Sequence, residues 1–190
     1  MNAVEMLAAL TIAALGTSAV VPAVSGMLRS ARLNGLASDL SSEMAKARME
    51  AVARGAYTGI RFEATPDGGR FTLYLDGGDR GIRSAEIAAG VDTPLTPPRE
   101  VAARHHGVRI GIAPQGPVPR VPPASGLLQP TDDPIAFGGS DIYSCSPTGE
   151  TSTGTLYMTD GVDMRAIVAF GPTGRMRLAS WDASTRRWRT

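Results

Sequence analysis

The feature that most constrains this chain is an uncharged segment near its amino terminus. Met6–Leu28 contains no charged side chain. As an α-helix, 23 residues span roughly 34 Å, enough to cross the ~30 Å hydrocarbon core of a bilayer. Because Lys and Arg are absent before Arg29, the segment lacks the basic flank of a cleaved signal peptide. Glu5 stands at its edge, and a plain membrane anchor leaves this carboxylate unexplained.

A carboxylate in lipid costs on the order of 2.5–3.5 kcal/mol and therefore calls for a positively charged partner. The nearest positive group in the sequence is the α-amino group of Met1. The helix dipole stabilises Glu5 in part, and the amine of a neighbouring molecule compensates it better. The position of Glu5 therefore indicates assembly of several copies.

Beyond Leu28 the apolar residues recur at helical steps of three or four, with charged residues on the other faces. Gly55 is a plausible C-cap. We predict one helix over residues 1–54, about 80 Å long. Residues 1–28 have no partner in the chain, whereas residues 29–55 offer an apolar stripe to a sheet. The stripe consists of Leu33, Leu36, Leu40, Met44, Ala47 and Ala51.

After Gly55 the apolar period falls to two, which predicts a head domain of residues 56–190. Two alternating runs flank the turn at residues 66–69 and predict a β-hairpin. Further short strands are expected at residues 108–112 and in PIAFG, IYSCSP, GTLYMTD, MRAIVAFGPTG and RMRLASWD. Ten of the 14 prolines fall in residues 94–134, which predicts a Pro-rich surface loop. The expected fold class is α+β, with the second half of a long helix packed on an antiparallel sheet.

Glu5, the apolar run and Pro22 together resemble the mature N-terminus of type IV pilins and type II secretion pseudopilins. The resemblance implies the pilin fold and a Met1 that prepilin peptidase exposes and N-methylates. It also implies that Glu5 pairs with Met1 of an adjacent subunit and that Pro22 kinks the helix. A kinked or melted stretch is expected between Gly16 and Val21. Most relatives begin with Phe, and the alternative that Met1 is an initiator stays open.

The second half of the chain narrows the resemblance to the GspH/FimT group. FGGSDIYSCSPTGETSTGTLYMTDG and IVAFGPTGRMRL are similar to the C-terminal half of these pseudopilins. The matching positions are Pro147, Gly149, Gly154, Leu156, Tyr157, Gly174, Arg175 and Arg177.

This resemblance implies a structural subunit of a bacterial type IV pilus or type II secretion pseudopilus. Its partners are further copies of itself or other pilins, and it requires neither a cofactor nor catalysis. The chain is expected in the inner membrane before assembly, and then in a periplasmic pseudopilus or an extracellular pilus. A singly anchored periplasmic binding module is a weaker alternative.

An alternative function is DNA binding by a minor pilin in natural transformation. From Arg165 onward the chain has six arginines and one acid, Asp182, although its net charge is only +1. The GRMR element and the basic tail resemble the contact element of DNA-receptor pilins, with Trp181 and Trp188 available to stack on bases. The competing interpretation is solvated arginines beside a small tryptophan core. The candidate residues are Arg175, Arg177, Arg186, Arg187 and Arg189.

Other candidate sites are weaker. Asp76, Asp79 and Glu86 offer oxygen ligands for Ca²⁺, but their spacing does not match an EF-hand loop, and a glycine turn is the simpler interpretation. His105 and His106 are adjacent and would point in opposite directions on a strand, with no acidic neighbour in the sequence to complete a metal site. Cys145 is the single cysteine, so no intramolecular disulfide can form.

Overall fold

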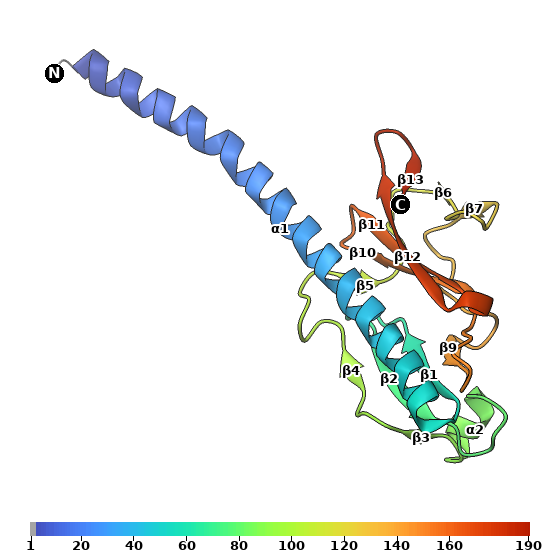
Figure 1. Cartoon of the computed structure of the whole chain (residues 1–190). Coiled ribbons are helices and arrows are strands. Elements are labelled where there is room, and N and C mark those ends of the chain that lie inside the picture. Colours follow the sequence, from blue (N-terminus) through green and yellow to red (C-terminus); the bar gives the residue numbers. More distant parts are fainter. Residues whose placement is uncertain (1–2) are drawn as a thin grey trace.

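The computed structural model describes the backbone from Ala3 to Thr190 and the side chains from Gly26 onward. Helix α1 (Ala3–Arg54) forms one uninterrupted rod. Its first half projects away from a β-rich head that is built around its second half (Figure 1). The expected α+β class, with a long N-terminal helix and antiparallel sheets, is confirmed.

The sequence predicted a kinked or melted stretch between Gly16 and Val21. The backbone of α1 is helical through these residues, so the stretch is not melted. A glycine costs a helix about 1 kcal/mol, and a proline removes one backbone hydrogen bond. Helix propagation is cooperative, so the turns on either side carry the helix across such a local weakness.

The end of α1 is set by Gly55, as predicted. Gly55 adopts a left-handed backbone with φ of 61°. Its N–H donates to the carbonyl of Val52 at 3.3 Å, and the N–H of Ala56 donates to the carbonyl of Ala51 at 3.2 Å. This pair of hydrogen bonds is a Schellman motif, in which glycine is favoured because it has no Cβ to strain the turn.

The strands form two main antiparallel sheets where the sequence predicted one. Sheet A has the order β3-β2-β1-β9, with β4 also paired to β2. It contains the predicted hairpin, and Phe62 lies opposite Phe71 in its register. Its strands are β1 (Thr58–Glu63), β2 (Arg70–Leu75), β3 (Thr93–Pro94), β4 (Arg99–Glu100) and β9 (Ile142–Cys145). Cys145, the last residue of β9, also forms an isolated antiparallel bridge with Thr151.

Sheet B has the order β13-β12-β11-β10-β5, with β8 also paired to β10. The last strand, β13, was not expected from the sequence. A 3-10 turn, η1 (Gly171–Thr173), joins β11 to β12. The strands are β5 (Arg109–Ile110), β8 (Ile135–Ala136), β10 (Gly154–Thr159), β11 (Met164–Phe170), β12 (Arg175–Asp182) and β13 (Arg187–Arg189).

The predicted apolar stripe of α1 is buried between the two sheets. Every residue of the stripe is at most 1% exposed. Sheet A contributes Ile60 and Phe62, and sheet B contributes Leu156 and Ile167 to this first core. Because truncating a buried Leu or Met to Ala costs about 2–5 kcal/mol, the stripe fixes how the helix sits on the head.

The Pro-rich segment is more than the surface loop that the sequence predicted. It supplies a second core on the face of sheet B opposite α1, with Val121 and Leu128 fully buried. Proline cannot donate to a ladder, which limits this segment to two-residue strands. Two of them, β6 (Val118–Pro119) and β7 (Leu127–Leu128), pair with each other. The remaining short helix, α2 (Ser84–Ala88), lies between β2 and β3.

Candidate functional site

The predicted assembly residues lie outside the side chains that the structure describes. Met1 falls before the described backbone, and Glu5 and Pro22 belong to the part of α1 described by its backbone alone. From Gly26 onward, where the structure describes side chains, no helical stretch is both long and apolar enough to cross a bilayer.

The second half of α1 is fastened to the head by Arg48. Its Nε donates to the carbonyl of Gly149 at 2.7 Å, and its two terminal nitrogens lie 3.4–3.5 Å from the carbonyls of Thr173 and Gly174. Two PTG turns, at residues 147–149 and 172–174, therefore meet on one helical side chain. Gly174 has a φ of 60°, and a Cβ there would lie 2.6 Å from the Arg48 guanidinium.

Several positions that carry the family resemblance have structural roles. A Cβ on Gly154 would lie 2.3 Å from the carbonyl oxygen of Ala136, so only glycine fits between β8 and β10. Leu156 packs in the first core, and Tyr157, on the opposite face of β10, packs in the second. The Tyr157 hydroxyl accepts from the N–H of Val121 at 3.4 Å. These residues hold the head together.

The five candidate DNA-binding arginines do not share one surface. On β12, Arg175 and Arg177 lie on the side-chain face of Trp181, which packs on the second core. Trp181 lies opposite Trp188 in the β12–β13 register. Arg187 and Arg189, the neighbours of Trp188 on β13, therefore lie on the other face, toward α1. Arg186 sits in the connecting turn with φ of 51°.

Arg177 and the two tryptophans of this hairpin make their contacts within the head. Arg177 donates to the carbonyl of Pro122 at 2.5 Å, and its guanidinium lies 5.8 Å from the centre of the Phe170 ring. The indole of Trp188 donates to the carbonyl of Pro119 at 2.7 Å. The rings of Trp181 and Trp188 are 5.4 Å apart, and both pack against the second core. This arrangement matches the tryptophan core that the sequence offered as the competing interpretation.

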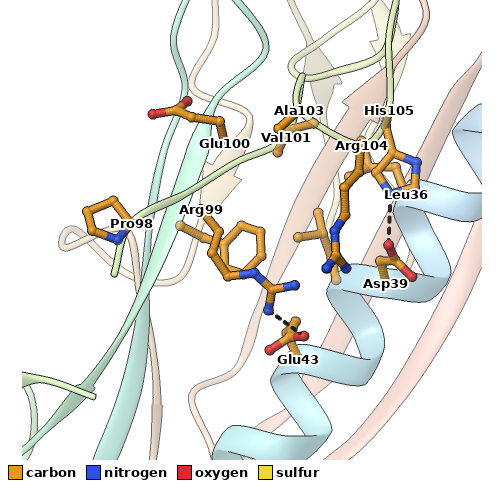
Figure 2. A pocket seen from close by; sticks show the side chains of 12 residues that line it. Leu36, Asp39, Glu43, Pro98, Arg99, Glu100, Val101, Ala103, Arg104 and His105 are labelled. Carbon is orange, nitrogen blue, oxygen red and sulfur yellow. Dashed lines mark hydrogen bonds and ion pairs between the residues drawn. The ribbon is translucent and has the colours of Figure 1, made fainter. Parts of the chain in front are cut away.

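A groove of about 330 Å³ lies between α1 and residues 98–105, which we call the strap (Figure 2). Two contacts one helical turn apart tie the strap to α1. Arg99 pairs with Glu43 at 2.7 Å, and the imidazole Nε2 of His105 lies 2.8 Å from Asp39. The His105 ring packs on Gly35, where a Cβ would lie 3.4 Å from it.

The floor of the groove is apolar and its walls are charged. Arg99 lies 5.2 Å from the centre of the Phe71 ring, in cation–π geometry. Burial raises the pKa of Glu43, but hydrogen bonds from Arg99 and Lys46 outweigh this and hold that pKa below its usual value. Figure 2 shows the Arg104 side chain directed toward the helix between these pairs. Opposite charges therefore balance along the groove, and the strap serves to close the head against α1.

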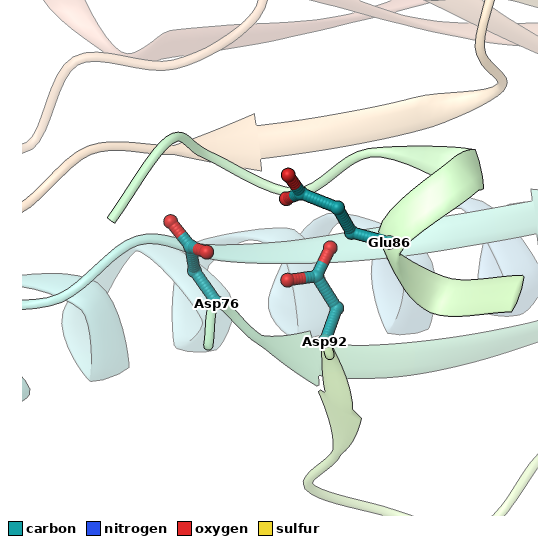
Figure 3. Close-up of side chains that lie close together, drawn as sticks. All are labelled: Asp76, Glu86 and Asp92. Atoms are coloured by element: carbon teal, nitrogen blue, oxygen red, sulfur yellow. The ribbon is translucent and has the colours of Figure 1, made fainter. Parts of the chain in front are cut away.

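Three carboxylates gather beside the loop that follows β2 (Figure 3). One oxygen from each of Asp76, Glu86 and Asp92 lies within 4.8 Å of the others. Asp79, which the sequence placed in this set, lies outside the cluster on an exposed turn with φ of 54°. The third carboxylate of the cluster is therefore Asp92, which the sequence did not single out, and not Asp79.

The two buried aspartates of this cluster organise the loop. Asp76 accepts from the N–H groups of Gly78 and Gly81 at 2.8 and 2.6 Å. Asp92 accepts from those of Gly77 and Arg83 at 3.3 and 3.0 Å. These four hydrogen bonds from backbone N–H groups satisfy the carboxylates of both aspartates, so neither aspartate requires a cation.

Cys145 and the histidines have local roles. Cys145 is fully buried, and burial raises the pKa of its thiol to about 12, so it stays protonated. His105 has the acidic neighbour Asp39, which sequence spacing did not reveal. His106 is exposed and has no hydrogen-bond partner among the described residues. No family model, curated protein or solved structure matches this chain.

Proposed function

We propose that this chain is a structural subunit of a bacterial type IV pilus or type II secretion pseudopilus, of the GspH/FimT group. The observation that carries the proposal is a helix of two halves. Met6–Leu28 is uncharged, and the helix backbone of this half projects beyond the head (Figure 1). Residues 33–51 bury their apolar stripe in the head. The first half needs an apolar partner, which the membrane supplies before assembly and neighbouring helices supply afterwards.

Glu5 is the assembly residue in this proposal. In the membrane its carboxylate is costly, and in a filament the terminal amine of a neighbouring subunit's Met1 neutralises it. Prepilin peptidase exposes and methylates Met1, and Pro22 gives the helix a point at which it can bend during packing. The chain itself supplies no catalysis.

The head is suited to a mechanical role because it is clamped to the helix at several points. Arg48 joins α1 to two turns, and the strap joins it at Asp39 and Glu43. Thr58 adds a buried hydrogen bond of 2.7 Å to the carbonyl of Ala47. A force applied to the helix is thereby transmitted to both sheets.

The test is a Glu5→Ala variant, compared with Glu50→Ala as a matched control. Glu50 is also on α1 but is partly exposed and pairs only with Arg54 in the described structure. We expect Glu5→Ala to remain in the membrane fraction and to be missing from sheared fibres, whereas Glu50→Ala is present in both. Recovery of Glu5→Ala in fibres at the level of the parent chain would contradict the proposal.

A further inference from the structure

We propose that the end of the head from which α1 emerges is an anionic-lipid binding surface, formed by arginines of α1 and of the β12–β13 hairpin. This inference rests on the proposed function, since it requires the first half of α1 to lie in a bilayer. The surface, which we call the arginine collar, consists of Arg29, Arg32, Arg165, Arg186, Arg187 and Arg189.

The position of the hairpin follows from two contacts along α1. Gly174, just before β12, lies beside Arg48. Arg165, which lies opposite Ser180 of β12, donates to Asn34 at 2.8 Å and to Ser30 at 3.3 Å. Strand β12 therefore runs antiparallel to α1, toward the end from which the helix emerges.

The turn of the hairpin lies level with the place on α1 where the uncharged segment meets its first charged residue, Arg29. Asp182 lies two residues beyond Ser180, about 7 Å further along the strand. That distance equals between four and five residues of helix. Counted toward the amino terminus from the level of Ser30 and Asn34, which Arg165 contacts, it places the turn near residues 27–29. Figure 1 shows the hairpin (red) at the end of the head that faces the projecting helix.

Arg29 and Arg32 continue the same surface on the helix. Arg29 lies one helical turn before Leu33, and Arg32 lies one turn before Leu36. Both arginines are therefore on the same side of α1 as the buried stripe, just before the head begins to cover it. Both are exposed, and neither has an ion-pair partner among the described residues. They are the first charged residues after the uncharged segment.

The balance of charge at this end favours an anionic partner. Against the six arginines stand four described aspartates: Asp182, which pairs with Arg189, Asp160 and Asp163 in the β10–β11 turn, and Asp67, which lines a pocket with Asp160. The amides of Val162 and Asp163 donate to Asp160, so part of that carboxylate is engaged locally. Val162, at the tip of the same turn, is 52% exposed and offers an aliphatic contact beside the arginines.

Arginine is the residue suited to such a partner. Its planar guanidinium binds phosphate oxygens through two parallel hydrogen bonds. Basic side chains held close to a membrane are attracted by anionic headgroups, and salt screens this attraction. The collar would hold the head against the membrane until the subunit is extracted into a filament.

The two tryptophans of the chain, Trp181 and Trp188, both lie in the hairpin and report on its position. The full chain is reconstituted into bilayers of neutral phosphatidylcholine, or of the same lipid with phosphatidylglycerol, each containing a nitroxide-labelled headgroup. We expect stronger quenching of tryptophan fluorescence in the anionic bilayer. The excess is expected to disappear in about 1 M salt, where the Debye length is about 3 Å.

Removing the hairpin arginines should abolish the excess quenching. Each arginine near an anionic surface contributes about fivefold to the ratio of docked to undocked heads. The variant R186Q/R187Q/R189Q should therefore lower that ratio on the order of 100-fold. The matched control, R80Q/R83Q/R175Q, removes the same charge from exposed positions elsewhere on the head and should behave as the parent chain. R29Q/R32Q, which removes no described ion pair, should lower the ratio on the order of 25-fold.

The possible failures can be told apart. Circular dichroism and tryptophan emission in neutral bilayers check that each variant is folded. Resistance to alkaline extraction tests insertion of α1, and its loss would count against the proposed function itself. An inserted chain with equal quenching in neutral and anionic bilayers, or equal loss in both triple variants, would overturn the collar alone. Salt-sensitive binding of duplex DNA by the same arginines, with no effect of lipid charge, would also overturn it.

Discussion

Replacing Arg48 by alanine tests whether one helical side chain holds the two PTG turns of the head. The bond from Nε to the carbonyl of Gly149 is short, at 2.7 Å, whereas those to Thr173 and Gly174 are long, at 3.4–3.5 Å. A hydrogen bond involving a charged group is worth about 1.5–3 kcal/mol, and bonds near 3.5 Å add little. We therefore expect Arg48→Ala to cost about 2 kcal/mol.

For a chain of this size, about 2 kcal/mol corresponds to a fall in Tm of about 4–8 °C. The assay is thermal unfolding of the full chain in detergent, followed by circular dichroism and tryptophan emission. The control is Arg54→Ala, which removes an exposed pair with Glu50 and should cost at most about 1 kcal/mol. The Tm of Arg48→Lys should lie between those of Arg48→Ala and Arg54→Ala, because an ammonium cannot reach all three carbonyls.

A double variant sharpens this test. Alanine at Gly174 would place a Cβ 2.6 Å from the Arg48 guanidinium, on a backbone with φ of 60°. Combining Gly174→Ala with Arg48→Ala removes one source of the clash, so the combined loss should be smaller than the sum of the two single losses. The reasoning is refuted if Arg48→Ala unfolds within 1 °C or so of the parent chain, or if the two substitutions are additive.

Three further predictions concern single side chains. The pKa of the Glu43 carboxyl is lowered in the folded chain. Glu43 therefore stabilises the fold above its unfolded pKa, near 4.5, and this stabilisation is lost as the pH falls below that value. Glu43→Gln should flatten the decline of Tm in this pH range. Gly154→Ala should unfold the head or cost several kcal/mol, whereas Gly139→Ala, where a Cβ meets nothing within 4 Å, should be nearly neutral in the same melt. The buried Cys145 thiol, with a pKa of about 12, should resist a thiol reagent in the native chain and react after denaturation, and labelling of the native chain would contradict its burial.

The helical part of the fold could be predicted because its signals are local. A stripe at steps of three and four and a glycine after it are sufficient to place the second half of α1 and its end at Gly55. The hairpin of β1 and β2 follows in the same way from alternation around a glycine turn. These elements depend on neighbouring residues in the chain.

The features that the sequence did not reveal depend on contacts between distant segments. Arg48 meets turns more than 100 positions away, and Asp39 meets His105, which lies 66 positions along the chain. The arginines of the tail appeared as one basic cluster, but pairing of β13 with β12 divides them between two faces. Asp92 joined the acidic cluster because α2 and β3 return the chain to the end of β2.

The central claim is that Glu5 neutralises the terminal amine of a neighbouring subunit within a filament. The most direct measurement is a cryo-EM reconstruction of purified fibres with side chains resolved. The account predicts the Glu5 carboxylate inside the fibre core, within about 4 Å of the Met1 amine of an adjoining chain. A carboxylate that faces solvent, or lies far from every neighbouring amino terminus, would contradict it.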